Sequence, residues 1–347
     1  MSKTVFSWEC PSNIALVKYW GKHGRQLPMN PSVSLTLKNC HTTTKIHCEP
    51  ASPNQAIAVS FKLGSTENPS FGQKISQFLE SIRAELPFLG NYAYNIQSDN
   101  SFPHSSGIAS SASGMGALAL CVCSLAEAEG YVFKSQMDFY QRASYYARLG
   151  SGSASRSIYA PWAVWGNTPT TVGSSDLYAV PVSRNVHTVY HNLNDVVLIV
   201  DAGVKKVSSR AGHALMNDNR FAKTRYEQAH DNMARVLEAL ETGDLELFTE
   251  VVEEEALTLH ALMMTSKPSF ILMKPQTLAV LEAVRDFRTA TKVPICFTLD
   301  AGANVHLLFP ESHKAVCMSF IEQELRAFCA QGKFIADVAG QGPQLLR

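Results

Sequence analysis

The first third of the chain combines two hydrophobic periods. In segments 56–64 and 92–98, apolar residues alternate with polar or small ones at the period of two that is typical of half-buried strands. Between these segments, apolar residues recur at the three- and four-residue spacing of one helix face, at Ile75, Phe78, Leu79, Ile82 and Leu86. Segment 13–37 also contains a strand-like run. Strands and helices are therefore mixed without a strict βαβ alternation, which predicts an α+β fold.

Two longer helices are expected next along the chain. The first covers about 108–129 and ends at Gly130, and the second covers about 136–149 and ends at Gly150. Glycine is favoured directly after a helix because it adopts the left-handed conformation at no steric cost.

The second half reads as a small sheet covered by helices. The pattern predicts a buried strand at 196–203, helices at 218–242 and 245–264, a strand, tight turn and strand within 294–310, a helix at 311–331 and a last strand at 332–339. The composition changes near residue 190, and we place a domain boundary there. The two domains are then 1–190 and 191–347.

Composition favours a small-molecule ligand. Thirty basic and thirty acidic side chains cancel, so no overall field attracts nucleic acid or an anionic membrane, and any anion must bind at a local site. The first ten residues lack the apolar core of a signal peptide, and no apolar run approaches the roughly 20 residues that span a bilayer. We expect a cytoplasmic protein without nucleic-acid or membrane partners.

The chain has eight cysteines, which are scattered mostly among apolar neighbours without a CxxC pair. This distribution favours reduced core residues over a disulfide framework or a structural zinc site.

The stretch "SFPHSSGIASSASGMGALAL" (101–120) places glycine and serine where a loop becomes an apolar helix. The first backbone N–H groups of a helix have no internal partners and bind anions, and glycine lets the backbone approach phosphate oxygens. A plain serine N-cap is the alternative interpretation. Six small or hydroxyl residues among the seven in 105–111 exceed what a cap needs, although the Walker pattern is absent.

Three further segments carry candidate chemistry. Lys18 and Lys22 flank a Tyr-Trp-Gly in a strand-like run, where a buried lysine needs an anion and an exposed one would only snorkel. Arg156 follows a Gly/Ser turn and suits bidentate capture of a carboxylate or phosphate, unless it is an incidental surface residue. Asp300 ends a buried strand before small residues; it either caps its own turn or faces a cleft as a reactive group.

In this order along the chain, these segments resemble motifs of the GHMP kinase superfamily and, within it, of the diphosphomevalonate decarboxylase family. "PHSSGIASS" resembles the superfamily's phosphate loop, and "NIALVKYWGK", "SGSASRS", "KKVSSRAG" and "DAGANVHLL" are similar to motifs of the decarboxylases. The resemblance covers most of the chain. It implies an N-terminal domain of the ribosomal-S5 type and a ferredoxin-like C-terminal domain.

The resemblance also implies roles for residues at the matching positions. The catalytic residues would be Asp300, Lys18 and Arg156. Substrate would be bound by Tyr19, Lys22, Ser151, Ser153, Arg156 and Ser208. The ATP phosphates would be bound by Ser105, Ser106, Gly107, Ala109, Ser110 and Ser111. A magnesium ion would be held by Ser111 or a nearby serine of the loop.

The implied activity is the ATP-dependent decarboxylation of mevalonate 5-diphosphate to isopentenyl diphosphate, with release of ADP, phosphate and CO2, by a homodimeric enzyme of the mevalonate route to isoprenoids. Three alternatives stay open within the same fold. They are a mevalonate 3-kinase, a phosphomevalonate decarboxylase and a catalytically silent nucleotide-binding protein.

Overall fold

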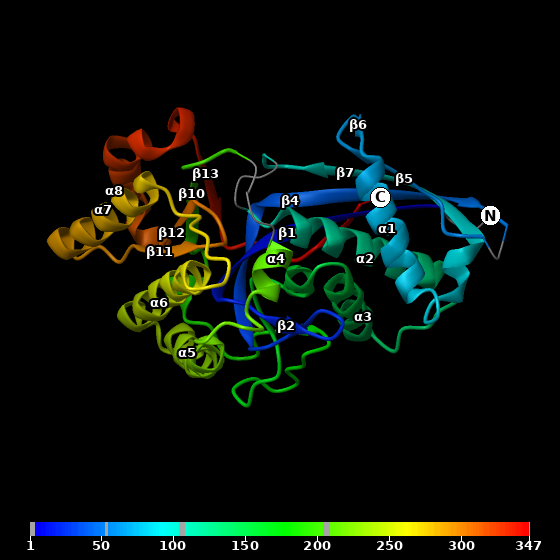
Figure 1. Cartoon of the computed structure of the whole chain (residues 1–347), viewed down its shortest axis with the longest axis horizontal. Helices are drawn as coiled ribbons and strands as arrows, with labels where there is room; N and C mark the ends of the chain where they lie inside the picture. Colours follow the sequence, from blue (N-terminus) through cyan, green and yellow to red (C-terminus); the bar gives the residue numbers. More distant parts are fainter. Residues whose placement is uncertain (1–3, 53–54, 104–107, 204–208, 347) are drawn as a thin grey trace.

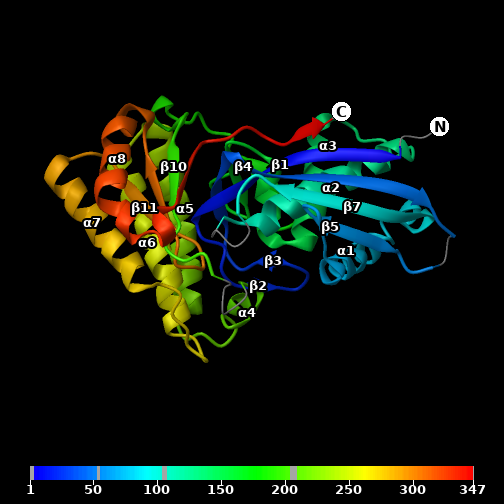
Figure 2. The ribbon, with the colours of Figure 1, turned by 90° about the horizontal axis from the view of Figure 1, so that it is seen from above.

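The computed structural model describes residues 4–52, 55–103, 108–203 and 209–346 and consists of two sheets with helices packed against them (Figures 1 and 2). The first sheet has the strand order β14-β1-β4-β7-β5-β6, with β8 pairing with β4 and β9 with β8. The second sheet has the order β11-β12-β10-β13, and all its neighbours are antiparallel. Both chain ends lie in the half of the molecule that contains the first sheet.

The first sheet is built on two long antiparallel strands. Its strands are β1 (Val5–Val17), β4 (Ser32–Pro50), β5 (Val59–Leu63), β6 (Thr66–Glu67), β7 (Tyr92–Asn100), β8 (Trp162–Trp165), β9 (Ala179–Pro181) and β14 (Gln344–Leu346). A separate hairpin of β2 (Lys22–His23) and β3 (Leu27–Pro28) follows β1. The register of β1 against β4 shifts between Pro11 and Asn13 and again between Ala15 and Val17, so β1 is irregular just before Lys18.

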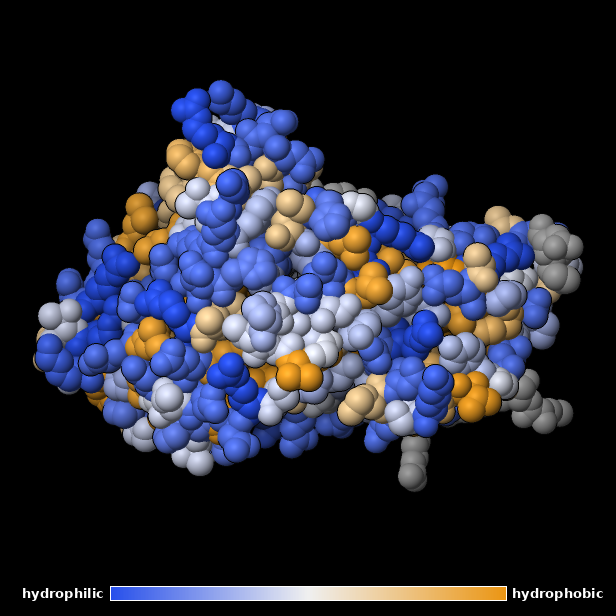
Figure 3. Space-filling model, turned by 90° about the horizontal axis from the view of Figure 1, so that it is seen from below, coloured by the Kyte–Doolittle hydropathy of each residue, from blue (hydrophilic) through white to orange (hydrophobic). Residues whose placement is uncertain are grey.

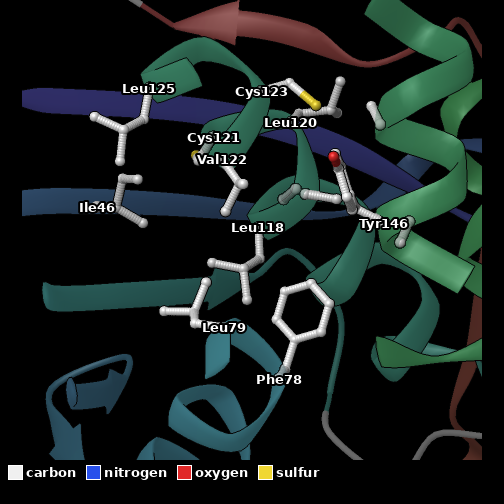
Figure 4. Close-up of a cluster of buried hydrophobic side chains, with 14 of the residues drawn as sticks. Ile46, Phe78, Leu79, Leu118, Leu120, Cys121, Val122, Cys123, Leu125 and Tyr146 are labelled. Carbon is white, nitrogen blue, oxygen red and sulfur yellow. The ribbon is translucent and has the colours of Figure 1, made fainter. Parts of the chain in front are cut away.

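Three helices cover the first sheet: α1 (Pro69–Ile82), α2 (Ser110–Ala128) and α3 (Gln136–Gly150). Alanine and glycine bring α2 close to the sheet, and a Cβ on Gly116 would lie 2.5 Å from the Sγ of Cys10. Figure 4 shows the resulting core, in which α2 side chains such as Leu118 meet Leu79 of α1, Ile46 of β4 and Tyr146 of α3.

The core position of α2 corrects one expectation from the sequence. Within the described residues, this helix alone is long and apolar enough to cross a bilayer, whereas we expected no such run. In the fold, 72% of its most apolar 18-residue segment is buried inside the protein, as expected for a helix at the centre of the core. On the face shown in Figure 3, hydrophobic residues lie scattered among hydrophilic ones.

The second sheet has the strand order of a ferredoxin-like domain. Its strands are β10 (Asn194–Leu198), β11 (Cys296–Leu299), β12 (Val305–Phe309) and β13 (Phe334–Val338), and its helices are α4 (Ser209–Ala214), α5 (Ala222–Thr242), α6 (Leu245–Met264), α7 (Pro275–Thr291) and α8 (Lys314–Phe320). Gly243, with φ at +81°, ends α5, and the side chain of Asp244 caps α6 immediately afterwards. The α+β fold with two domains is confirmed.

One hydrophobic cluster spans the two halves, and the last strand of the chain joins the first sheet. Residues of β1, β4 and β8 pack with residues of α5 and α6 in a single buried cluster. The carboxylate of Asp337 in β13 accepts hydrogen bonds from the backbone N–H groups of Lys38, Asn39 and Cys40 in β4. The chain then returns to the first sheet, where β14 pairs with β1. The division into 1–190 and 191–347 stays a prediction.

Most predicted elements are present with shifted ends, but one helix was missed and Gly150 has a different role from the one expected. Helix α7 was not predicted. Gly150 is the last residue of α3 rather than a left-handed residue after it, and Ser151 forms the C-cap. Gly150 is small for another reason, because a Cβ there would lie 1.9 Å from the Cε of Met115. Gly130 does adopt a positive φ of 87° after α2, as expected.

The region predicted as one helix at 311–331 changes its hydrogen-bonding pattern along its length. Short 3-10 turns at Glu311–His313, Arg326–Phe328 and Ala330–Gly332 and a π turn at Ile321–Leu325 flank α8. Other 3-10 helices cover Pro87–Asn91, Gly152–Ile158 and Thr188–Tyr190. All eight cysteines are free and buried, which confirms their assignment as core residues.

Candidate active site

A cavity of about 790 Å³ lies where the end of β1 meets both halves of the protein. Its wall contains ten of the residues singled out from the sequence: Lys18, Tyr19, Lys22, Ala109, Ser110, Ser111, Ser151, Ser153, Arg156 and Asp300. The remaining four, Ser105, Ser106, Gly107 and Ser208, lie outside the described residues. These ten residues come from four separate segments of the chain, and their spacing in the sequence did not by itself require them to meet in one cavity.

Lys18 is the first residue after β1, and only 2% of it is exposed. Its Nζ lies 3.6 Å from Oδ1 of Asp300 and donates a hydrogen bond of 2.5 Å to the carbonyl oxygen of Ala15. A solvated strand face is therefore the wrong interpretation of this lysine. Burial lowers the pKa of Lys18, and the charges of Asp300 and Glu255 oppose that shift.

Asp300 lies directly after β11, with 29% of its side chain exposed to the cavity. Its backbone carbonyl oxygen lies 3.1 Å from Nε2 of His260. Among the described residues, its carboxylate accepts no backbone hydrogen bond from its own turn, while Lys18 lies within ion-pair distance. The carboxylate therefore faces a lysine and open space rather than capping the turn.

Arg156 is a buried arginine in the 3-10 helix Gly152–Ile158, with 2% of the residue exposed. Its guanidinium donates to Oγ of Ser32 at 2.6 Å and to Oδ1 of Asn13 at 3.5 Å, and it lies over the ring of Trp165. Its buried Nε has no hydrogen-bond partner, and among the described residues no carboxylate lies within ion-pair distance. Burial lowers its pKa from 12.5 to about 10, so it stays positively charged at neutral pH.

A buried cation without an acid partner is costly, because desolvation is not offset by a counter-charge. The negative charge of Asp300 makes the largest favourable contribution to the charged form of Arg156, but the two side chains do not form a salt bridge. Arg156 therefore lacks an anion that a ligand of the cavity can supply. This contradicts the interpretation of Arg156 as an incidental surface residue.

Tyr19 and the Gly/Ser turn form the adjoining wall. The hydroxyl of Tyr19 is buried and has no hydrogen-bond partner among the described residues, and its ring packs edge-on against Trp165 at 4.6 Å. A Cβ on Gly152 would lie 2.8 Å from that hydroxyl, so only glycine fits between Ser151 and Ser153 here. Tyr19, Ser151 and Ser153 therefore place hydroxyl groups along this wall of the cavity.

The start of α2 differs from the serine cap that was the simpler interpretation. The N-cap is Ala109, and within the part of the chain that the structure describes no side chain caps the helix. Ser111 is exposed at the cavity, with its Oγ 3.5 Å from Oγ of Ser151. The first turn of a 19-residue helix thus begins at the cavity wall without a side-chain cap, the arrangement in which a helix N-terminus binds an anion.

The sequence analysis missed three charged or ionisable residues of the wall. Arg25 and Lys74 line the cavity from the β2–β3 hairpin and from α1. Nothing distinguished them from ordinary surface cations in the sequence. His213 lies between the rings of Tyr19 and Trp20, and its Nδ1 accepts a hydrogen bond of 3.0 Å from the N–H of Gly21.

His213 is neutral in this setting. Burial, with smaller effects of Lys22 and Arg156, lowers its pKa to about 3. It is an acceptor for the Gly21 N–H and an aromatic spacer. Its position directly after the "KKVSSRAG" segment was the one available signal for it.

Comparison with known proteins supports the same class. A model of the diphosphomevalonate decarboxylase-like N-terminal domain matches residues 10–178, and a model of the mevalonate 5-diphosphate decarboxylase C-terminal domain matches residues 195–342. The diphosphomevalonate decarboxylase of Ganoderma lucidum is 27% identical over 87% of this chain and 78% of its own length. The phosphomevalonate decarboxylase of Haloferax volcanii is 29% identical over 86% of both proteins.

Solved structures agree over nearly the whole chain. The mevalonate diphosphate decarboxylase of Staphylococcus aureus is similar with a TM-score of 0.84 and 29% identity, covering 99% of this chain and 98% of its own. A structure described as MDDEF in complex with MVAPP, AMPPCP and magnesium is similar with a TM-score of 0.84 and 28% identity, covering 99% of each chain.

The two-domain fold and the cavity at the start of α2 define a protein of the GHMP superfamily. More narrowly, the chain belongs to the diphosphomevalonate decarboxylase family, the ATP-binding decarboxylases of the mevalonate pathway. The resemblance seen in the sequence motifs is confirmed.

Replacing Ser111 with alanine is expected to raise the KM for ATP by about 2- to 10-fold, the range that follows from losing one neutral hydrogen bond. Steady-state kinetics with ATP varied at saturating second substrate measure this change. The matched control is Ser113→Ala, because Ser113 lies further along the same helix, is fully buried and bonds to Thr42. Ser113→Ala should lower the melting temperature and leave the KM unchanged. An unchanged KM in Ser111→Ala would remove Ser111 from the nucleotide site.

Proposed function

We propose that this protein catalyses the ATP-dependent decarboxylation of mevalonate 5-diphosphate to isopentenyl diphosphate, releasing ADP, phosphate and CO2. The observation that carries the proposal is the arrangement of Arg156, Lys18 and Asp300 in one cavity. It combines a buried guanidinium that lacks an acid partner with a buried ammonium 3.6 Å from a cavity-facing carboxylate. The relatives named above support the substrate class.

The substrate carboxylate fits Arg156. A planar guanidinium binds a carboxylate through two parallel hydrogen bonds, and the pairing supplies the counter-charge that Arg156 lacks. The bond to be broken joins this carboxylate to the substrate carbon chain. Holding the carboxylate at Arg156 orients that bond for loss of CO2.

Lys18 and Asp300 fit the reacting carbon, C3, and its hydroxyl. Bound Mg-ATP supplies the γ-phosphoryl group that turns the tertiary hydroxyl into a leaving group. Lys18 neutralises negative charge on the oxygen as it is phosphorylated and as it departs with phosphate. The carboxylate of Asp300 stabilises the positive charge that develops at C3. The electron pair of the broken carbon–carbon bond then forms the alkene as CO2 leaves.

The residues present fit a magnesium ion bound mainly through phosphate. Among the described residues there is no group of three or more His, Cys, Asp or Glu side chains that could hold a metal. Magnesium prefers phosphate oxygens, waters and one or two oxygen side chains, so Ser111 or another serine of the phosphate loop is a suitable protein ligand. The homodimer and the cytoplasmic location stay predictions.

The wall of the cavity favours a diphosphate over a monophosphate. Lys22 and Arg25 contribute positive charge, Ser151 and Ser153 contribute hydroxyls, and the buried hydroxyl of Tyr19 has no partner in the described ranges. We expect kcat/KM for mevalonate 5-diphosphate to exceed that for the 5-monophosphate by at least about 10-fold, which is the value of one charge-assisted hydrogen bond. Parallel assays of the two substrates measure the ratio.

The phosphomevalonate decarboxylase of Haloferax volcanii makes the monophosphate a real second candidate. A kcat/KM for the monophosphate equal to or above that for the diphosphate would replace our assignment with this one. The Lys22→Ala variant provides a second comparison, because it should weaken the diphosphate more than the monophosphate.

The proposed function is tested by incubating the protein with ATP, magnesium and mevalonate 5-diphosphate and measuring both ADP and CO2. We expect the two products in equal amounts, together with isopentenyl diphosphate. ADP without CO2 would identify a kinase acting on the C3 hydroxyl. Neither product, from folded protein, would identify a silent nucleotide-binding relative and overturn the proposal.

A further inference from the structure

A fully buried ion pair lies directly behind Lys18, outside the cavity wall. The guanidinium of Arg225 in α5 donates two hydrogen bonds to the carboxylate of Glu255 in α6, at 2.8 and 2.6 Å. Their side chains are 1% and 0% exposed. Asn232 adds a third donor to the same carboxylate at 2.9 Å.

Both residues also bind the backbone of Lys18. The N–H of Lys18 donates to Oε2 of Glu255 at 2.7 Å, and the carbonyl oxygen of Lys18 accepts from Arg225 at 3.1 Å. Asn30 donates to the same carbonyl oxygen at 2.9 Å. Because β1 ends at Val17, Lys18 has left the ladder of the first sheet, and these partners satisfy its peptide groups instead.

This arrangement is poorly explained by stability alone. Desolvating two charges costs several kcal/mol per ion, and buried ion pairs often stabilise a protein less than apolar residues of similar volume. A charged pair can form hydrogen bonds with both the N–H and the carbonyl oxygen of Lys18, which apolar residues cannot do. It fixes the position of that residue relative to α5 and α6, which belong to the other half of the protein.

We propose that Arg225 and Glu255 are positioning residues that hold Lys18 in register with Asp300 across the two halves of the protein. Lys18 belongs to the first half and Asp300 to the second, so the 3.6 Å separation of their charged groups depends on how the halves are joined. The pair joins them at Lys18 itself. This inference rests on the proposed function, because Lys18 matters to the reaction only if that function holds.

The carboxylate of Glu255 also acts on the charge of Lys18. Among the described residues, four charged groups act on Lys18: Glu255 and Arg225 through its backbone, Asp300 at 3.6 Å from its Nζ, and Arg156 through its charge. Two histidines lie one residue further away, His260 at the carbonyl oxygen of Asp300 and His213 against the ring of Tyr19. The charges of Asp300 and Glu255 raise the pKa of Lys18, whereas burial and Arg156 lower it. Removing the charge of Glu255 therefore lowers this pKa further.

The test uses Glu255→Gln and Arg225→Lys in the full chain, with kcat and KM measured from pH 6 to pH 10. In Glu255→Gln we expect kcat to fall at least about 100-fold, because a displaced reacting group loses this much. The alkaline fall of the pH–rate profile should move to lower pH, since Lys18 loses its proton earlier. In Arg225→Lys the charge remains but the paired hydrogen bonds are lost, so kcat should fall while the alkaline limb stays in place. The KM for ATP should stay near the wild-type value in both.

The matched control is Glu253→Gln on the same helix. Glu253 is buried, forms a two-point pair with Arg288 at 2.6 and 3.2 Å, and accepts from the backbone N–H of Phe297. Unlike Glu255, it makes no hydrogen bond to Lys18 within the described residues. Glu253→Gln should lower the melting temperature without moving the alkaline fall of the pH–rate profile. Glu255→Asp keeps the negative charge, so its alkaline fall should occur at the wild-type pH.

Several outcomes would overturn the inference. Wild-type kcat per folded molecule in Glu255→Gln would do so, and so would an equal limb shift in Glu253→Gln. If Glu255→Gln does not fold, Arg225→Lys decides, because lysine keeps a positive charge at the site: a wild-type kcat in that variant rejects a positioning role. Wild-type protein that releases no CO2 would instead refute the proposed function, which separates the two failures.

Discussion

Replacing Asp300 with asparagine is expected to lower kcat by about 1,000-fold or more while ATP binding stays close to wild type. Asparagine keeps the size of the side chain but removes the charge that faces the reacting carbon. Losses of this size are typical when an electrostatic or acid–base group is removed from a site that excludes water. The start of α2, where ATP is proposed to bind, does not depend on that charge. Single-turnover kinetics and equilibrium titration with ATP measure the two effects separately.

A matched control for Asp300 exists in the same chain. Asp201 also begins an Asp-Ala-Gly sequence after a strand, and its carboxylate lies 3.5 Å from Nζ of Lys274. Both side chains are more than 40% exposed, and neither lines the large cavity. Asp201→Asn should keep its turnover within a few-fold of wild type. Retained kcat in Asp300→Asn, with only a lower melting temperature, would assign Asp300 a structural role instead.

Replacing Arg156 with glutamine is expected to lower kcat/KM by about 1,000-fold or more without lowering the melting temperature. The loss reflects the missing charge-assisted hydrogen bonds to the substrate carboxylate, which are among the strongest in proteins. The melting temperature should stay unchanged or rise, because the substitution removes a buried charge that has no acid partner among the described residues. Calorimetry and steady-state kinetics on one preparation measure both quantities.

Arg148 provides the contrasting control. It is equally buried, but its guanidinium donates to the carbonyl oxygens of Leu177 and Arg25, at 2.7 and 2.5 Å. Arg148→Gln should therefore lower the melting temperature and largely keep turnover. If Arg156→Gln behaves in the same way, Arg156 is a structural arginine and the substrate carboxylate binds elsewhere.

The local pattern of the sequence was enough to predict most helices and strands. Helix α2 follows from its apolar run and the glycine that ends it, and α1 follows from the spacing of its buried face. These features depend on residues a few positions apart, whose periodicity decides which face is buried. The motifs around Lys18, Arg156 and Asp300 pointed to the right family because each is a short contiguous string.

The same local reasoning failed at the start of α2 and at the end of α3. A serine N-cap was the alternative interpretation of the start of α2, but Ala109 occupies that position, and nothing nearby in the sequence distinguishes the two residues. Gly150 was expected to end α3 by its conformation, whereas its small size is required by Met115 of α2. At Gly150, the packing of α3 against α2 decided which residue fits.

By itself, the sequence determined the α+β class, the family and the identity of the candidate residues, since periodicity and short motifs are local properties of the chain. Only the tertiary structure decided that Lys18 is buried beside a carboxylate 282 positions away, that Arg156 is buried without an acid partner, and that Arg225 and Glu255 bind the backbone of Lys18. Charge and exposure at a site depend on which distant segments pack together. That packing minimises the free energy of the whole chain, and no window of neighbouring residues contains it.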